Sequence, residues 1–120
     1  MPPSALLIEK VVDIAGQGVL CLHGPLTMEN VRPFQNAIRR EEKADTVILD
    51  LTEVPYVDSS GLGSLITAYV SRQKAGKRVA LTGVNARVYR LFEITKVESL
   101  FPIFDTIEQA ISALSGAAQA

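Results

Sequence analysis

The sequence predicts an α/β fold with a mixed sheet of four to five strands and about four helices, in the order β-β-α-β-α-β-α-β-α. Short apolar runs, bounded by glycine, proline or polar residues, recur along the chain and indicate strands. After the first two runs, they alternate with segments whose apolar residues have helical spacing. The run Thr46–Leu51 is apolar at every position except Thr46 and Asp50, as in a strand covered on both faces.

The first two strands are predicted at Leu6–Ile14 and Val19–His23. The segment between them, Ala15-Gly16-Gln17-Gly18, is short and rich in glycine, which favours a hairpin and an antiparallel pair. Cys21 is expected to face inward as a small apolar residue. His23, the only histidine, is expected to be structural or solvated.

The first helix is predicted over Thr27–Glu42. Pro33 is tolerated only near the start of a helix, so the regular part should begin near Asn30. A stripe at helical spacing faces the core: Val31, Phe34, Ala37 and Ile38. The charged run Arg39–Glu42 at its end is expected to be a solvated face.

The central strand Thr46–Leu51 is followed by a second helix with Arg72 and Lys74 in its last turns, where they complement the helix dipole, and with Gly76 as terminator. Val79–Thr82 then returns as a parallel strand after a right-handed crossover. Asp50 should either cap loop N–H groups near Ser59 or face water at the edge of the strand.

The last third of the chain is predicted to hold a short helix, an edge strand and a final helix. Asn85 caps a helix that runs through Phe92, and Phe101–Phe104 forms a short edge strand in which Pro102 is permitted. Asp105 and Glu108 have the spacing of a capping box. Three cations form either an ordinary solubility surface or a small binding patch: Arg87, Arg90 and Lys96.

Composition favours one soluble domain over residues 1–120, with residues 115–120 as a frayed tail. Of the 120 residues, 48% are hydrophobic and 21% charged, and the net charge of −1 argues against nucleic acid as a partner. Cys21 is the only cysteine, so we expect no disulfide, no metal site and a reducing, cytoplasmic location. The apolar run Ala5–Ile8 is too short for a signal peptide or membrane insertion. The oligomeric state stays open.

The candidate site is the stretch Asp58-Ser59-Ser60-Gly61-Leu62-Gly63-Ser64-Leu65, which opens the second helix. Each glycine in a first turn costs about 0.5 to 1 kcal/mol relative to alanine, so two of them suggest close approach by another molecule. The alternative is a plain capped helix with a loose first turn, in which Asp58 or Ser59 accepts from a free N–H.

This stretch resembles the phosphorylation-site segment of bacterial anti-sigma factor antagonists, in the STAS-domain family. Two further segments are similar to that family, the helix Val88-Tyr89-Arg90-Leu91-Phe92-Glu93-Ile94-Thr95 and the loop Leu22-His23-Gly24-Pro25-Leu26-Thr27. The resemblance implies a STAS-like fold and Ser59 as phosphoacceptor, with Ser60 as the rival. Pro25 and Thr27 stand where the family often has acidic residues, which weakens any transfer of partner or nucleotide contacts to that loop.

The resemblance also implies partner switching. The unphosphorylated chain would bind an anti-sigma factor that is a serine kinase and so release a sigma factor; phosphorylation would end binding, and a serine phosphatase would restore it. The expected contact residues are Asp58, Ser59, Ser60, Gly61, Leu62, Gly63 and Ser64.

Two other classes stay open. The first is a STAS-type structural or regulatory subunit of a transport or signalling complex, in which Ser59 is merely a cap. The second is an enzyme, disfavoured because the sequence lacks a phosphate-binding GxxxxGK[ST], metal-ligand spacing and an acid/base pair. We therefore expect no cofactor, although a nucleotide could still use the helix N-terminus.

Overall fold

The predicted α/β class and element order are confirmed. The computed structural model describes residues 5–14 and 17–119, and the side chains of residues 5–11 and 17–114. Its elements are β1 (Leu7–Ile14), β2 (Gln17–His23), α1 (Val31–Arg40), β3 (Thr46–Glu53), α2 (Ser59–Lys74), β4 (Arg78–Thr82), α3 (Ala86–Ile94), β5 (Ile103–Phe104) and α4 (Ile107–Gln119).

The five strands form one mixed sheet in the order β1-β2-β3-β4-β5. As predicted, β1 and β2 pair antiparallel, with Ile14 opposite Gln17, while β2, β3, β4 and β5 are parallel to one another. Of the four predicted turn residues, Ala15 and Gly16 lie outside the described residues, whereas Gln17 and Gly18 belong to β2, which begins two residues earlier than predicted. Because β2, β3 and β4 are parallel, their carboxyl ends meet at one edge, from which the loops to α1, α2 and α3 leave.

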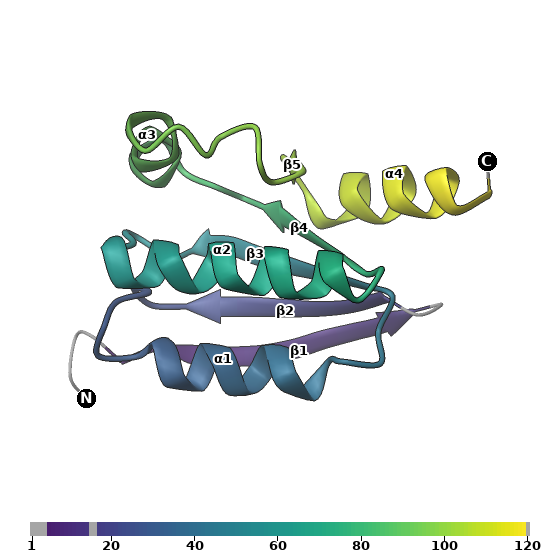
Figure 1. Cartoon of the computed structure of the whole chain (residues 1–120), viewed down its shortest axis with the longest axis horizontal. Helices are drawn as coiled ribbons and strands as arrows, with labels where there is room; N and C mark the ends of the chain where they lie inside the picture. The colour runs from purple at the N-terminus through teal and green to yellow at the C-terminus, as the bar shows by residue number, and fades with distance from the viewer. Residues whose placement is uncertain (1–4, 15–16, 120) are drawn as a thin grey trace.

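Helices cover the two faces of the sheet unequally (Figure 1). α1 and α2 lie side by side on one face and enclose the larger apolar core, which includes the fully buried Phe34, Leu49 and Leu65. α4 covers the other face with a smaller cluster around Ile48 and Ala110. The carboxyl end of β3 and the start of α2 are thus anchored in the larger core.

The helix boundaries follow local chemistry. α1 begins after Asn30, with Pro33 as its third residue, where the missing N–H has no intrahelical partner to lose. α2 ends before Gly76, whose φ of +75° is the left-handed conformation that favours glycine. Asn85 caps α3 as predicted, because its Oδ1 accepts from the N–H of Val88 at 2.8 Å.

The predicted capping box of α4 is wrong by one residue. The Oγ1 of Thr106 accepts from the N–H of Gln109 at 3.1 Å, and the Oε1 of Gln109 accepts in return from the N–H of Thr106 at 3.3 Å. This reciprocal pair satisfies two N–H groups at the helix start, which Asp105 and Glu108 were expected to do. α4 reaches Gln119, so the backbone is helical over most of the segment expected to fray; the side chains of residues 115–120 lie outside the described ones.

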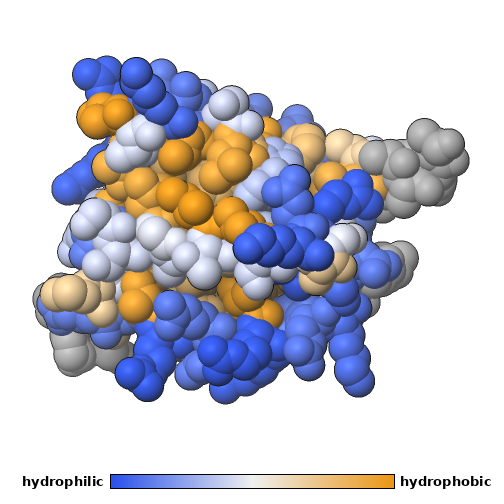
Figure 2. Space-filling view, viewed as in Figure 1, coloured by the Kyte–Doolittle hydropathy of each residue, from blue (hydrophilic) through white to orange (hydrophobic). Residues whose placement is uncertain are grey.

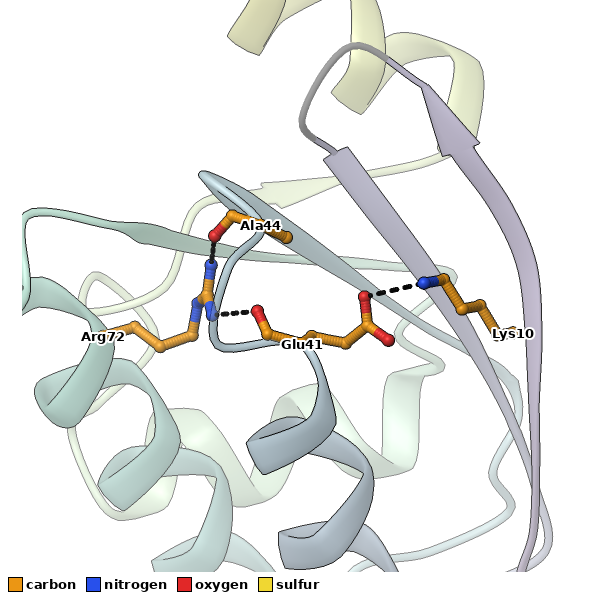
Figure 3. Close-up of polar contacts among 4 residues, drawn as sticks. All are labelled: Lys10, Glu41, Ala44 and Arg72. Atoms are coloured by element: carbon orange, nitrogen blue, oxygen red, sulfur yellow. Dashed lines mark hydrogen bonds and ion pairs between the residues drawn. The ribbon is translucent and has the colours of Figure 1, made fainter.

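Arg72 does not simply complement the dipole of α2 (Figure 3). Only 5% of it is exposed, and its guanidinium donates to the carbonyls of Glu41 and Arg78, each at 3.0 Å, and to that of Ala44. Burial lowers the pKa of Arg72, and the carboxylates of Glu41 and Asp45 partly oppose that shift. Arg72 therefore fastens the end of α1 and the entries of β3 and β4 to α2.

Glu41 likewise departs from the expected solvated face. Its side chain is only 8% exposed and forms an ion pair with Lys10 of β1 at 3.2 Å (Figure 3). A Cβ on Gly18 would lie 2.5 Å from the Oε1 of Glu41, so the bare backbone of β2 makes room for this carboxylate. Arg39, Arg40 and Glu42 are exposed, as predicted.

No helix in the described part of the chain is both long enough and apolar enough to cross a membrane.

Candidate partner-binding site

The predicted site forms the N-terminus of α2. Asp58 is its N-cap, with extended backbone, and its Oδ1 accepts from the N–H of Gly61 at 2.8 Å. Of the two proposed caps, Asp58 is therefore the one that acts. Ser59 is the first helical residue and is exposed, whereas Ser60 is half-buried. Of the two candidate phosphoacceptors, Ser59 presents more of its surface to solvent.

The loop between β2 and α1, residues 24–30, packs against this helix start. Leu26 forms an isolated parallel bridge with Val57, donates its N–H to the carbonyl of Tyr56 at 3.2 Å and accepts from the N–H of Asp58 at 3.2 Å. The other oxygen of Asp58, Oδ2, accepts from the N–H of Met28 at 3.1 Å. One carboxylate thus joins two segments that lie 30 residues apart.

The two glycines of the site, Gly61 and Gly63, differ in what surrounds them. A Cβ on Gly61 would lie 2.0 Å from the carbonyl oxygen of Leu26, so the close approach expected at this position is made by the protein's own loop. Gly63 is exposed, and a Cβ there would meet no atom within 4 Å. Only Gly63 leaves open surface for another molecule.

Leu62 and Ser64 do not border the exposed surface, contrary to expectation. Leu62 is 5% exposed and belongs to the main core. Ser64 is 6% exposed, and its hydroxyl donates to the carbonyl of Gly61 at 2.7 Å. Helical spacing turns Leu62 into the core and Ser64 toward α1, while Ser59, Gly63 and Thr67 stay exposed on α2.

Asp50 neither caps the loop near Ser59 nor simply faces water. Its Oδ1 accepts from the hydroxyls of Thr82 at 2.7 Å and Thr52 at 2.9 Å, so it links β3 to β4. Cys21 lies opposite Asp50 in the neighbouring strand. Burial, and then the charge of Asp50, raise the pKa of the Cys21 thiol, which keeps it protonated and unreactive near neutral pH.

His23 and Arg87, two other polar residues named in the sequence analysis, do not lie together in one site. The Nε2 of His23 pairs with Glu9 at 3.3 Å, on the β1–β2 hairpin. Arg87 stacks over the ring of Tyr56 with 5.0 Å between its Cζ and the ring centroid, which ties α3 to the segment before Asp58. In the described residues, no group of three or more His, Cys, Asp or Glu side chains could hold a metal ion.

The exposed surface of α2 is weakly polar over most of its length. Figure 2 shows a pale band over this helix and an apolar area between α2 and α3. The band reflects the glycine, serine and threonine residues on the outer side of α2. Val70 on α2 and Ile94 on α3 are 37% and 66% exposed.

This arrangement can present a hydroxyl for modification more readily than it can activate one. Both oxygens of Asp58 already accept backbone N–H bonds, so the adjacent carboxylate serves as a cap. The helix N-terminus stabilises a negative charge by about 0.3 to 1 kcal/mol at an exposed position. A phosphoryl group on Ser59 would receive that contribution.

The sequence gives little sign of the loop's part in this site. The long-range contacts run from Leu26 and Met28 to Val57, Asp58 and Gly61, and no local pattern announces them. Two signals point to the loop: the resemblance of Leu22–Thr27 to a family segment, and the topology, because parallel strands bring the loops after β2 and β3 to the same edge of the sheet.

Comparison with known proteins gives a consistent picture. The STAS domain family model matches residues 7–110. An anti-sigma-B factor antagonist of Listeria monocytogenes is 42% identical over 55 residues, a stretch that is 46% of this chain and about half, 48%, of that relative. The crystal structure of an anti-sigma factor antagonist from Mycobacterium paratuberculosis superposes with a TM-score of 0.82 and 21% identity, over 93% of this chain and 96% of that one. A sulfate transporter family protein from Wolinella succinogenes superposes with a TM-score of 0.78 and 25% identity, over 92% and 93% of the two chains.

Proposed function

We propose that this chain, which belongs to the STAS domain family, is an anti-sigma factor antagonist switched by phosphorylation of Ser59. Its unphosphorylated form binds an anti-sigma factor that is also a serine kinase, and this binding releases a sigma factor. Phosphorylation ends the binding and a serine phosphatase restores it. This function places the chain in the cytoplasm.

The observation that carries the proposal is the position of Ser59. It is the first residue of α2, exposed, directly after a cap that is held by two hydrogen bonds. A kinase can therefore reach the hydroxyl without local unfolding. The named Listeria relative, an anti-sigma-B factor antagonist, supports the same function.

The switch acts on the surface of the protein. A phosphoryl group adds a charge of about −1.5 to −2, which Asp58 repels and the helix N-terminus attracts. These opposing effects are small compared with the stability of a domain, which is about 5 to 15 kcal/mol. Within an interface, however, an unpaired anion and its hydration shell weaken binding by a few kcal/mol, a factor of about a hundred or more.

The test uses each anti-sigma factor serine kinase encoded in the same genome. Incubation with ATP followed by intact mass and phosphopeptide mapping should show one phosphate on Ser59, which is retained in Ser60→Ala and lost in Ser59→Ala. Ser59→Ala should bind the kinase like the wild type, and Ser59→Asp should bind at least tenfold more weakly. Equal affinities of Ser59→Ala and Ser59→Asp would contradict the proposal, and a phosphate on Ser60 would move the site.

A second candidate is favoured by the likeness to the sulfate transporter family protein. The chain would then be a regulatory subunit of a transport or signalling complex, and Ser59 only a helix residue. This role predicts stable co-purification with such a complex. Ser59→Ala would leave the association intact and change stability by no more than about 1 kcal/mol.

A further inference from the structure

We infer that Met28, on the loop between β2 and α1, is an apolar anchor for the partner that recognises Ser59. This inference rests on the proposed function and names a second part of its binding surface. Met28 is 71% exposed, the highest value among the large hydrophobic side chains that the structure describes. A single exposed apolar residue needs no explanation by itself, so the argument depends on where and how it is held.

The position of Met28 is fixed by the cap of the phosphoacceptor helix. Its N–H donates to the Oδ2 of Asp58, while the Oδ1 of the same carboxylate accepts from the N–H of Gly61. Asp58 directly precedes Ser59, so the backbones of Met28 and of the phosphoacceptor segment are tied through one side chain. A partner that binds at the Ser59 hydroxyl therefore also contacts the loop that carries Met28.

The loop is held in shape by its own hydrogen bonds. The side chain of Asn30, 5% exposed, accepts from the N–H of Thr27 at 2.7 Å and donates to the carbonyl of Pro25 at 2.6 Å. Asn30 stands at the N-cap position of α1 but makes no side-chain capping bond, because its amide serves the loop. A side chain presented from a fixed backbone loses less freedom on binding than one presented from a mobile loop.

The size of a specific interface requires contacts beyond Ser59, and this loop is joined directly to the Ser59 segment. A standard protein interface covers about 800 Å² on each partner, far more than one serine offers. Methionine is unbranched and polarizable, so it adapts to an apolar pocket on a partner, and it is enriched at interfaces. Residues 25–28 carry no charged side chain, so this part of the contact should depend little on salt.

The test compares Met28→Gln with Val11→Gln. Glutamine has a similar length and no apolar end, and Val11 is a second exposed apolar residue, 50% exposed on the edge strand β1. The probes are the anti-sigma factor serine kinases encoded in the same genome, with affinity measured by calorimetry and the rate of Ser59 phosphorylation measured with ATP. Thermal unfolding of both variants confirms that each is folded.

Met28→Gln should weaken binding by about tenfold and slow phosphorylation, with a similar ratio at low and high salt, as expected for a central apolar contact. Val11→Gln should stay within about twofold of the wild type. Wild-type affinity for Met28→Gln, with binding still lost in Ser59→Asp, would overturn the inference and leave the proposed function standing. Failure of the wild type to bind any of these kinases would overturn both.

Discussion

At the scale of single residues, Asp58 has the most consequences. The sequence predicts that it lies directly before the candidate phosphoacceptor Ser59 and is one of two possible caps of α2. The structure gives it two acceptor roles, one for Gly61 within α2 and one for Met28 across the chain. The first is local and follows from helix chemistry, while the second depends on the loop after β2 and could not be foreseen from residue spacing.

Substitution of Asp58 separates these two roles. Asp58→Ala removes both acceptors and should lower the free energy of unfolding by about 1 to 2 kcal/mol, the upper part of the range for a lost N-cap, because the N–H of Met28 also loses its acceptor. Asp58→Asn keeps one carbonyl oxygen for Gly61 but offers an NH₂ group, which cannot accept from Met28, so it should lose less. Urea denaturation of both variants measures the difference.

Asp105→Ala is the matched control, since Asp105 is exposed and does not cap α4. It should change the free energy of unfolding by less than about 0.5 kcal/mol. Equal stability of Asp58→Ala and the wild type would show that the carboxylate holds neither segment.

At the scale of elements, the order of strands and helices could be predicted because each has a local cause. The apolar run of β3, Pro33 early in α1, Gly76 after α2 and the Asn85 cap of α3 each fix one boundary. Polar side chains that join elements could not be assigned, because their partners lie far away in the sequence. Asp50 accepts from Thr82 of the next strand.

Arg72 shows this limit most clearly. Its place in the last turns of α2 predicts a charge that complements the helix dipole. In the structure it is buried and donates to carbonyls at the ends of three other segments, those of Glu41, Ala44 and Arg78. A planar guanidinium with five N–H donors suits such a cluster in a way that lysine does not.

Arg72→Met should therefore lower the free energy of unfolding by about 2 to 4 kcal/mol, since buried carbonyls that lose a donor cost about 1 to 3 kcal/mol each and partial hydration offsets some of this. Arg72→Lys should recover only a minor part. Chemical denaturation provides the measurement, with Arg39→Met as control, because Arg39 is exposed at the end of α1. A loss of unfolding free energy no larger than that of Arg39→Met would mean that water satisfies these carbonyls in place of Arg72.

At the scale of the whole molecule, the site combines segments that the sheet brings to one edge. The loops after β2 and β3 meet there because the strands are parallel, and the core under α1 and α2 holds both in place. The position of Ser59 could be predicted from local sequence and family resemblance. The contacts between the loop after β2 and the start of α2 could not, since they depend on how the two loops pack.

This architecture predicts that phosphorylation changes binding without changing the fold. Ser59 is exposed on a helix whose first two turns pack into the core through Leu62 and Leu65, so a new charge has few buried contacts to disturb. In the amide NMR spectrum of the phosphorylated chain, shifts should concentrate in residues 26–30 and 56–63, which share the Asp58 carboxylate and the Leu26 contacts. Phosphate removal by a serine phosphatase should restore the original spectrum. Large shifts spread over β1 and α4, which lie outside this contact set, would show instead that the switch works by rearranging the domain.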